Sequence, residues 1–509
     1  MGLFAKIKKN YSMPSITGIN QIDSLLQGPD NRWNIESAAG TAVAVTFSFP
    51  AELPAYADAN DPENQGFSPF NEEQKVAVRT ILDRIGSEFN ITFSEVADSA
   101  TAYGQMRFSN NNQGTVSSGF ATGPGSGSEE SGDVYINNAD ATNLTNIVPG
   151  TFIWSTLVHE IGHAIGLKHP GNYNAGDDTG AAEVTPYLSA TEDHVWYTVM
   201  SYTAAPQEQE RDWFGILDLG ALEHLYGKKD VAIGDNTYTY TDASGLNLTM
   251  IDDAGGTDTI DLSQITLGAV LDLSPGSFSS VGRAWDESLA KNSVSIGLKA
   301  IIENAIGTAS DDSITGNDAN NVLRGGAGND TLVGGAGIDA AVFNGDKSSY
   351  TISNDAGTLT VQGGDGNDSL TAIERLHFSD VRLAFDLDSD AGFIAKLLGV
   401  LAGKDAVANK EFVGIGLKAL EGSTQEGLMG AALDAVLGPN YTSGSVIDML
   451  FLNVAGVQPS DAQRTLYAGQ IDDGTFSAVS LSIAVAETDL NATNIGLVGL
   501  ATTGLEFIG

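Results

Sequence analysis

Nine-residue repeats in the second half of the chain limit its fold more than any other feature. Four follow one another directly, beginning at Gly307, Gly316, Gly325 and Gly334. Each has small or polar residues suited to a tight turn, Asp or Asn at its sixth position and usually an apolar residue at its eighth. A phase of nine kept over 36 residues is typical of a parallel β-roll, in which turns and short strands alternate. The alternative, a flexible linker rich in Gly and Asp, would not be expected to keep this phase.

The turns of these repeats predict calcium sites, because turn carbonyls and the sixth-position side chains supply oxygen ligands. The expected ligands are Thr308, Ser310, Asp312, Asn317, Ala319, Asn321, Gly325, Gly326, Ala327, Gly328, Asp330, Gly334, Gly335, Gly337 and Asp339. The fourth repeat has Ala341 where a larger strand residue is expected, so it predicts the end of the roll. A fifth copy stands apart, from Gly363 to Thr371.

Three of the six histidines lie within twelve residues, from His159 to Pro170. His159 and His163 are four residues apart and therefore project from one face of a helix. Gly166 is expected to end that helix and let the chain reverse, which brings His169 to the other two. Three imidazoles with an open fourth position predict a catalytic zinc site.

The chemistry expected at such a site is hydrolysis of a peptide bond. Zinc lowers the pKa of a bound water and polarises a carbonyl, and Glu160 would act as the general base and then pass the proton to the leaving amine. The alternative is a set of metal-free histidines on a helix surface. That alternative gives no reason for the presence of Gly166, His169 and Pro170 directly after the helix.

Composition excludes several classes of protein. Asp and Glu number 65 against 24 Lys and Arg, a net charge of −41, which argues against nucleic acid and anionic membranes as partners. There is no cysteine, so neither disulfides nor a thiol switch on the zinc is expected. The N-terminus lacks the apolar core of a secretory signal, and no apolar run is long enough to span a bilayer.

Local patterns also predict secondary structure. Strands are expected at Thr41–Phe49, Ile91–Val96, Gln105–Phe108 and Val134–Ile136, with a loop from Asn110 to Asp133. Helices are expected after the N-cap Asn71 and at Phe152–Ile165, Asp218–Tyr226, Phe393–Leu401 and Asp461–Asp472.

The extended motif His159-x-x-x-His163-x-x-Gly166-x-x-His169 resembles that of the metzincins. Its continuation through Asn172-Tyr-Asn-Ala-Gly176 and Val199-Met-Ser-Tyr202 is similar to the serralysins, which are bacterial metalloproteases with an RTX calcium roll. The resemblance extends over roughly residues 20–342.

The resemblance implies further site residues. Met200 would form the turn beneath the zinc, and Tyr202 would ligate the resting metal and later stabilise the oxyanion. Without the resemblance, a core Met and a core Tyr would be preferred. Additional calcium ligands would be Gly255, Gly256, Asp258, Asp261 and Glu303.

The resemblance also implies a secreted, extracellular monomer that cleaves protein substrates. Its other implied partners are a type I secretion apparatus, which reads the C-terminus, and a protein inhibitor.

We therefore expect an α+β multidomain protein. Its parts are an N-terminal segment (1–35), which is either a pro-segment or an N-terminal helix laid over the catalytic domain, a metzincin domain with a mixed sheet and helices (36–229), a parallel RTX β-roll (230–386) and a mainly α-helical module with the secretion signal (387–509). The alternative function is a calcium-dependent cell-surface or matrix protein whose metalloprotease domain is inactive. An intact set of three histidines, Glu160 and Tyr202 argues against that alternative.

Overall fold

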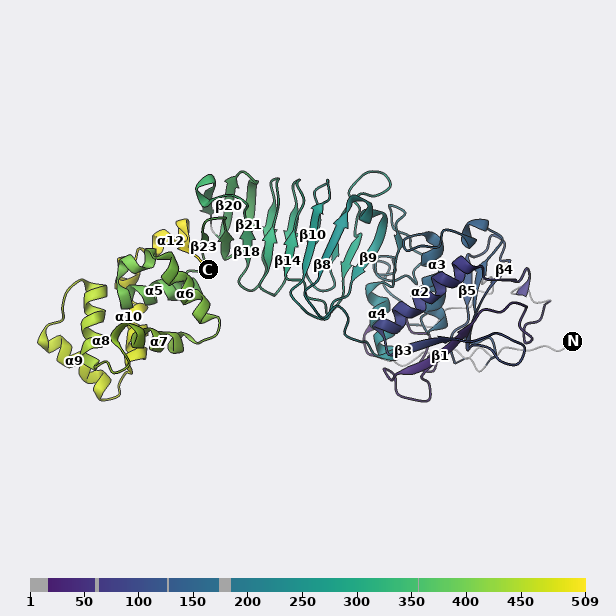
Figure 1. The fold of residues 1–509 in the computed structure, drawn as a ribbon, viewed down its shortest axis with the longest axis horizontal. Coiled ribbons are helices and arrows are strands. Elements are labelled where there is room, and N and C mark those ends of the chain that lie inside the picture. Colours follow the sequence, from purple (N-terminus) through teal and green to yellow (C-terminus); the bar gives the residue numbers. More distant parts are fainter. Residues whose placement is uncertain (1–16, 60–63, 126–127, 174–184, 356) are drawn as a thin grey trace. The chain divides into compact units, whose positions relative to one another are not determined.

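The computed structural model describes residues 17–59, 64–125, 128–173, 185–355 and 357–509. The chain forms two compact units, one made of Met1–Asp258 with Ser274–Ile301 and the other of Thr259–Leu273 with Ile302–Gly509. Figure 1 labels their helices and strands. None of the helices in the described ranges has the length and apolarity needed to cross a membrane.

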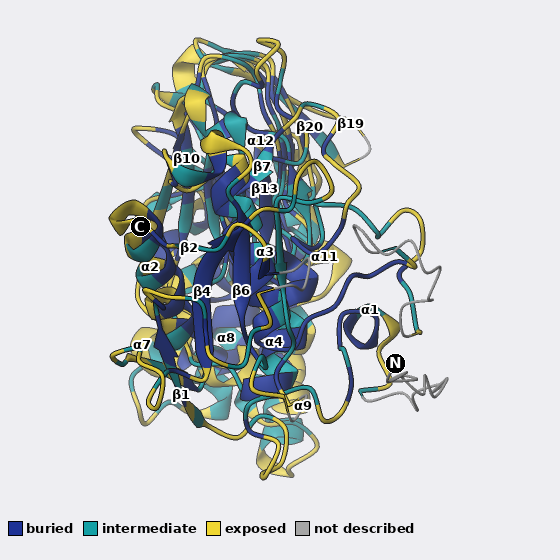
Figure 2. Cartoon of the chain, turned by 90° about the vertical axis from the view of Figure 1, so that its right-hand side faces the viewer, coloured by how far each residue is buried: buried dark blue, intermediate teal, exposed yellow. Residues whose placement is uncertain are grey.

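The first unit is built on a mixed sheet with the strand order β3-β1-β4-β6-β5, in which β2 also pairs with β4. Parallel pairing joins β3 to β1, β1 to β4 and β4 to β6, whereas β5 runs antiparallel to β6. Every residue of β4 and β6 is buried, and both strands are dark blue in Figure 2. The strand bounds are β1 Val43–Ser48, β2 Ser68–Pro69, β3 Ile91–Glu95, β4 Met106–Asn111, β5 Gly119–Ala121 and β6 Val134–Asn137.

Three longer helices accompany this sheet. They are α2 (Glu72–Glu88), α3 (Phe152–Ala164) and α4 (Ile216–Tyr226). Asn71 caps α2 through a reciprocal bond with Gln74, and α4 stops at Gly227, whose φ is +72°. A smaller sheet of this unit, in the order β12-β13-β9-β7, is formed by Phe278–Ser279, Val294–Ile296, Asn247–Ile251 and Glu210–Arg211. Strand β8 (Thr237–Thr241) also lies in this unit but is not part of that sheet.

One expectation for this unit was wrong. The loop expected from Asn110 to Asp133 contains β5, because three residues suffice for an edge strand when β6 supplies the hydrogen bonds. The expected N-terminal segment includes a short helix, α1 (Asn20–Asp23), whose Ile22 belongs to the core of the unit. Leu25 and Leu26 are fully buried, and the Leu25 carbonyl accepts a hydrogen bond from the Lys168 backbone. The first 16 residues of the expected N-terminal segment lie outside the described residues.

In the second unit, successive repeats contribute strands alternately to two sheets. One sheet runs β10-β14-β16-β18-β22, and the other begins β11-β15-β17-β21. Neighbouring strands are parallel, and partners such as Ala305, Leu323 and Ala341 are 18 residues apart, so two repeats make one turn. Their bounds are Thr259–Gln264, Asn304–Ile306, Val322–Arg324, Ala340–Val342 and Arg375–His377 for the first sheet, and Val270–Asp272, Ser313–Thr315, Thr331–Val333 and Gly366–Thr371 for the second.

The fourth repeat does not end this stack, contrary to expectation. Strand β18 pairs with β22, and β17 pairs with β21, which lies in the separate fifth repeat. Residues between the two repeats include the antiparallel strands β19 (Thr351–Asp355) and β20 (Thr358–Gly363), so they form an insertion. Ala341 is fully buried and is accommodated within the sheet. The insertion interrupts the nine-residue period of the sequence. The strands on either side of it still pair through backbone hydrogen bonds, so the stack continues.

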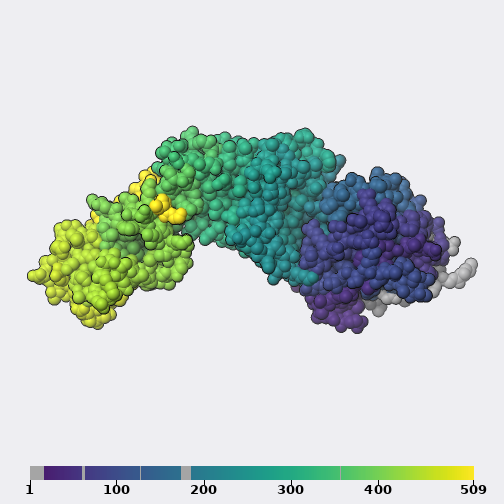
Figure 3. All heavy atoms as spheres, viewed as in Figure 1, coloured from purple at the N-terminus to yellow at the C-terminus, as the bar shows by residue number. Residues whose placement is uncertain are grey.

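The C-terminal helices, at the yellow-green end of Figures 1 and 3, pack around their own hydrophobic cluster. They are α5 (Asp390–Ala402), α6 (Lys410–Leu420), α7 (Gln425–Leu437), α8 (Ser443–Leu450), α9 (Asp461–Asp472), α10 (Ala478–Ala486), α11 (Asp489–Asn494) and α12 (Leu497–Thr503), with a π-helical turn at Phe451–Ala455. The last strand, β24 (Leu505–Phe507), pairs with β23 (Arg382–Ala384), which itself pairs with β22 at the edge of the first sheet. The end of the chain is therefore anchored in that sheet.

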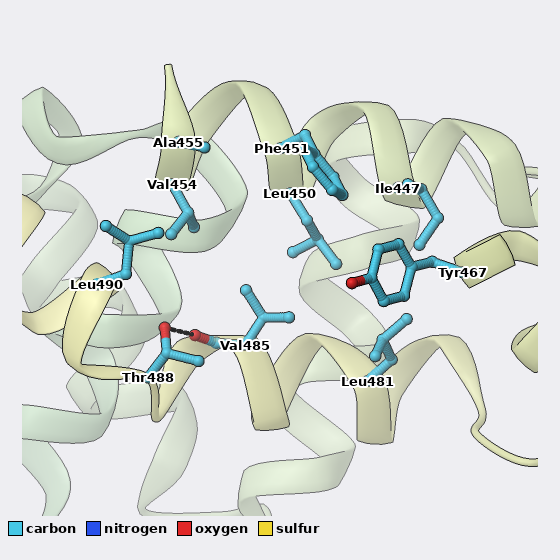
Figure 4. A pocket seen from close by; sticks show the side chains of 10 residues that line it. All are labelled: Ile447, Leu450, Phe451, Val454, Ala455, Tyr467, Leu481, Val485, Thr488 and Leu490. Atoms are coloured by element: carbon cyan, nitrogen blue, oxygen red, sulfur yellow. Dashed lines mark hydrogen bonds between the residues drawn. The ribbon is translucent and has the colours of Figure 1, made fainter. Parts of the chain in front are cut away.

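An apolar pocket of about 260 Å³ lies between these helices (Figure 4). Leu450, Val454 and Leu481 line it together with seven other residues, and the ten include no Asp, Glu, His, Lys or Arg.

Candidate metal centre

Helix α3 and the turn that follows it bring the three histidines of the motif together. One side of the helix is buried, and it carries apolar residues such as Leu157, Val158 and Ile161. Gly166 has a φ of +112°, and a Cβ at this position would collide with the Asn31 carbonyl. Only glycine suits this reversal, which carries the chain back to His169.

The Nε2 atoms converge on one point. They are 3.1 Å apart in His159 and His169 and 3.0 Å apart in His163 and His169. Nitrogens bound to zinc at tetrahedral positions are about 3.3 Å apart, so the spacing fits a metal ion. Elsewhere in the described ranges, no three His, Asp or Glu side chains are placed to share one ion.

Backbone carbonyls orient two of the three imidazole rings. The Nδ1 atom of His159 bonds the Val199 carbonyl at 2.8 Å, and that of His163 bonds the Leu167 carbonyl at 2.9 Å. The ring of Tyr173 lies beside that of His169, with centroids 5.6 Å apart. Burial lowers the pKa of His159 to about 4 and that of His169 to about 3, and it lowers the pKa of His163 well below its usual value. The rings are therefore neutral at pH 7 and keep lone pairs for a metal.

Glu160 lies beside the three histidines and faces β5. A Cβ on Gly119 would stand 2.8 Å from its Cγ atom, so the strand passes close to the carboxylate. Glu160 is 5% exposed, and its Oε2 atom has no hydrogen-bond partner among the described residues. Burial raises its pKa to about 8. The carboxylate has the free oxygen and the raised basicity that a general base needs.

Met200 and Tyr202 occupy different positions in one turn. Met200 is fully buried, and its Sδ atom lies 2.9 Å from the point where a Gly162 Cβ would stand, so it packs under α3. Tyr202 is 48% exposed, and its ring centroid lies 4.6 Å from that of His169 and 5.9 Å from that of His159.

Sequence reasoning missed Asp218, Tyr173 and Asp193. Asp218 is fully buried, and its carboxylate accepts a hydrogen bond from the N–H of Val199, the residue before Met200. The sequence pattern indicates only that a helix begins at Asp218. Tyr173 stands in the resembling motif, but its role depends on contacts with Tyr202 and Asp193, which are distant in sequence.

The expected calcium residues of the repeats face each other in pairs across the turns. Added Cβ atoms on Gly326 and Gly328 would meet the backbone of Thr308 and Ser310, and those on Gly335 and Gly337 would meet the backbone of Asn317 and Ala319. All four glycines have positive φ.

The sixth-position side chains form two columns. The Asp312 N–H donates to Asp330 at 2.9 Å, and the Asn321 N–H donates to Asp339 at 2.7 Å. Asp368 and Glu374, which sequence reasoning missed, continue the columns by accepting from the N–H groups of Asp330 and Asp339. The second carboxylate oxygens of Asp330 and Asp339 are buried and have no hydrogen-bond partner among the described residues.

The calcium residues expected from the resemblance are divided between the units. Gly255, Gly256 and Asp258 lie in the first, where Asp258 accepts a hydrogen bond from the Asn236 N–H at 2.7 Å. Asp261 and Glu303 lie in the second.

Comparisons with known proteins agree with this arrangement. A metallo-peptidase family M12 model matches residues 41–213, and a model of the peptidase M10 serralysin C terminal matches residues 219–394. Serralysin of Proteus mirabilis is 34% identical over 324 residues, 57% of this chain and 63% of that protein. Serralysin G of Dickeya chrysanthemi is 32% identical over 341 residues, 60% and 66%. Metallopeptidase AprA of Pseudomonas marginalis is 34% identical over 282 residues, 50% and 57%.

The matched region thus spans less than two thirds of the length of these relatives. Both family matches lie within residues 41–394, which contain the three histidines, the Met200 turn and the stacked repeats. Residues 41–394 of this chain belong to the serralysin-type metzincins.

Proposed function

We propose that this chain is a secreted zinc endopeptidase that hydrolyses peptide bonds of extracellular proteins. The observation that carries the proposal is the convergence of three neutral imidazoles beside a buried carboxylate with one free oxygen. Three nitrogen ligands with an open position are the donor set of catalytic zinc. When bound, zinc would supply Lewis-acid polarisation of the scissile carbonyl and would acidify the attacking water.

Three residues have distinct roles in this proposal. Glu160 accepts the proton of the attacking water and returns it to the leaving amine. Tyr202, which is half exposed at the edge of the site, would hold the metal in the resting enzyme and would supply a hydrogen bond to the oxyanion. Met200 packs beneath the histidines and does not ligate.

The second part of the proposal is that the repeats form an RTX β-roll that binds several calcium ions. The 18-residue register and the facing turn backbones support it. Burial raises the pKa of Asp330 to about 7 and that of Asp339 to about 6, and a cation would compensate the charge of these carboxylates. Because calcium is scarce in the cytosol, ion binding outside the cell would become folding free energy.

We further propose the organisation that goes with this function. The segments are 1–35, 36–229, 230–386 and 387–509, with catalysis in the second, calcium binding in the third and a secretion signal in the fourth. The partners would be protein substrates, a type I secretion apparatus and a protein inhibitor, and the chain would act as a monomer.

Cleavage of a denatured protein substrate by the purified chain, with calcium present, tests the peptidase proposal. Activity should disappear with a zinc chelator and return with zinc. Glu160→Gln should lower kcat by about 10²- to 10⁴-fold with zinc still bound, whereas the exposed Glu52→Gln should not change it. Full activity of Glu160→Gln would refute the mechanism. Stoichiometric zinc without cleavage of any substrate would instead favour a surface or matrix protein with an inactive domain.

A further inference from the structure

Tyr173 contacts the proposed zinc site at two points. Its ring lies 5.6 Å from the ring of His169. The same ring stacks on Tyr202, with centroids 4.8 Å apart and planes at 28°. Tyr173 therefore links the third histidine to the tyrosine at the edge of the site.

Asp193 fixes the Tyr173 side chain. The Tyr173 hydroxyl donates to Oδ1 of Asp193 at 2.6 Å, and the Ser201 hydroxyl donates to the same oxygen at 2.6 Å. The backbone N–H of Tyr202, the next residue after Ser201, donates to the Tyr173 hydroxyl at 3.4 Å. One carboxylate thus ties the Tyr173 ring to the segment that carries Tyr202.

Tyr202 needs such a support because its side chain is 48% exposed. Its described ring neighbours are His159, His169 and Tyr173. The two histidines are expected to bind the metal, so Tyr173 is the neighbour that can hold the phenol by stacking alone.

We propose that Tyr173, anchored by Asp193, is a positioning residue that keeps the Tyr202 phenol over the three histidines. The inference rests on the proposed function, since it concerns the orientation of a group in that site. An aromatic pair changes an orientation equilibrium by about three- to tenfold, which sets the size of the effect expected when the Tyr173 ring is removed.

Copper(II) substitution in the calcium-loaded full chain makes this orientation visible, because a phenolate bound to copper(II) gives a charge-transfer band. The wild-type band should be absent in Tyr202→Phe. Tyr173→Leu should lower the intensity of the band by about three- to tenfold. Tyr173→Phe keeps the ring but loses the bond to Asp193, so its band should be intermediate in intensity between those of wild type and Tyr173→Leu. Zinc affinity should change by less than about threefold in both Tyr173 variants, because the Tyr173 hydroxyl donates to Asp193 and not to an expected metal ligand.

Tyr56→Phe is the matched control, since Tyr56 also donates to a carboxylate, that of Asp133, away from the site. It should leave the band and kcat unchanged. With the zinc enzyme, Tyr173→Leu should lower kcat by about three- to tenfold without changing KM.

A full band in a folded Tyr173→Leu protein would overturn the inference, as would the absence of any band in an active wild type. If Tyr173→Leu does not fold, an unchanged band in Tyr173→Phe would overturn it equally. Failure of the proposed function is a different result, namely a wild type that holds zinc and cleaves nothing.

Discussion

Asp218 accepts a 2.7 Å hydrogen bond from the N–H of Val199, the residue whose carbonyl accepts the Nδ1–H of His159. Asp218 also accepts from the Thr198 hydroxyl at 2.5 Å and from the Gly215 N–H at 2.7 Å. A fully buried carboxylate on α4 thus orients an expected metal ligand through the backbone of one residue, Val199. Groups that orient the partners of metal ligands affect metal affinity without touching the metal.

Asp218→Asn should therefore weaken zinc binding by about tenfold or more. The amide retains one acceptor oxygen but loses the other, which leaves a buried N–H without a partner. Competition with a chromogenic chelator would measure the affinity. The control is Asp83→Asn, at an exposed site on α2, and equal affinities for both variants would contradict the argument.

Gly166→Ala should lower the free energy of unfolding by at least about 2 kcal/mol and displace His169. Its φ of +112° is strained for alanine, and the added methyl would collide with the Asn31 carbonyl. Gly114→Ala separates the two effects, because Gly114 also has positive φ but faces open space. Urea unfolding should show a smaller cost for Gly114→Ala, about 1–2 kcal/mol.

Asp133→Asn should change how stability depends on pH. Burial raises the pKa of Asp133 to about 7, although the hydroxyls of Tyr56 and Tyr135 donate to it. The folded state therefore holds this proton between about pH 4 and 7 while the unfolded chain has released it. This contribution to stability is present below about pH 4 and is lost as the pH rises to 7, by up to about 4 kcal/mol.

Urea unfolding of calcium-loaded protein across that range would test the pH prediction. Relative to wild type, Asp133→Asn should gain stability as the pH rises. Asp30→Asn, at an exposed position, should follow wild type at each pH. Parallel curves for wild type and Asp133→Asn would contradict the assignment.

Asp339→Asn should have opposite effects on stability in the absence and in the presence of calcium. Without calcium at pH 8, the variant should be at least as stable as wild type, because it removes a buried charge whose pKa is raised. With calcium it should be the less stable protein, because it loses a ligand and part of the binding free energy, which is about 2.7 kcal/mol at a hundredfold excess over Kd. Thermal unfolding with and without calcium measures both. Asp318→Asn, in an exposed turn position, should show no reversal.

Leu26→Ala should cost about 2–5 kcal/mol of unfolding free energy, since Leu26 is fully buried and pairs with Leu167 near the motif. Ile19, also in the N-terminal segment, is 55% exposed, and Ile19→Ala should cost much less. If urea unfolding gave the same small cost for Leu26→Ala and Ile19→Ala, the assignment of Leu26 to the core would be wrong.

Local patterns predicted most elements of the chain because caps and apolar periodicity act within a few residues. Helix α9 occupies the expected Asp461–Asp472, and α3 begins at the expected Phe152. Strand β5 and the continuation of the stacked strands beyond Val342 could not be predicted in this way, since both depend on hydrogen bonds with strands elsewhere in the chain.

In the candidate site, too, some features follow from the local sequence and others only from the folded chain. The sequence by itself determined the three histidines, Glu160 and the turn at Gly166, because helical spacing and one glycine place them within a dozen residues. Only the tertiary structure decided that Asp218 holds Val199, that Tyr173 stacks on Tyr202 and that Leu25, Leu26 and Trp33 pack in or against the core. These contacts join segments as far as 193 residues apart, and their energies come from burial and hydrogen bonds that exist only once the chain is folded.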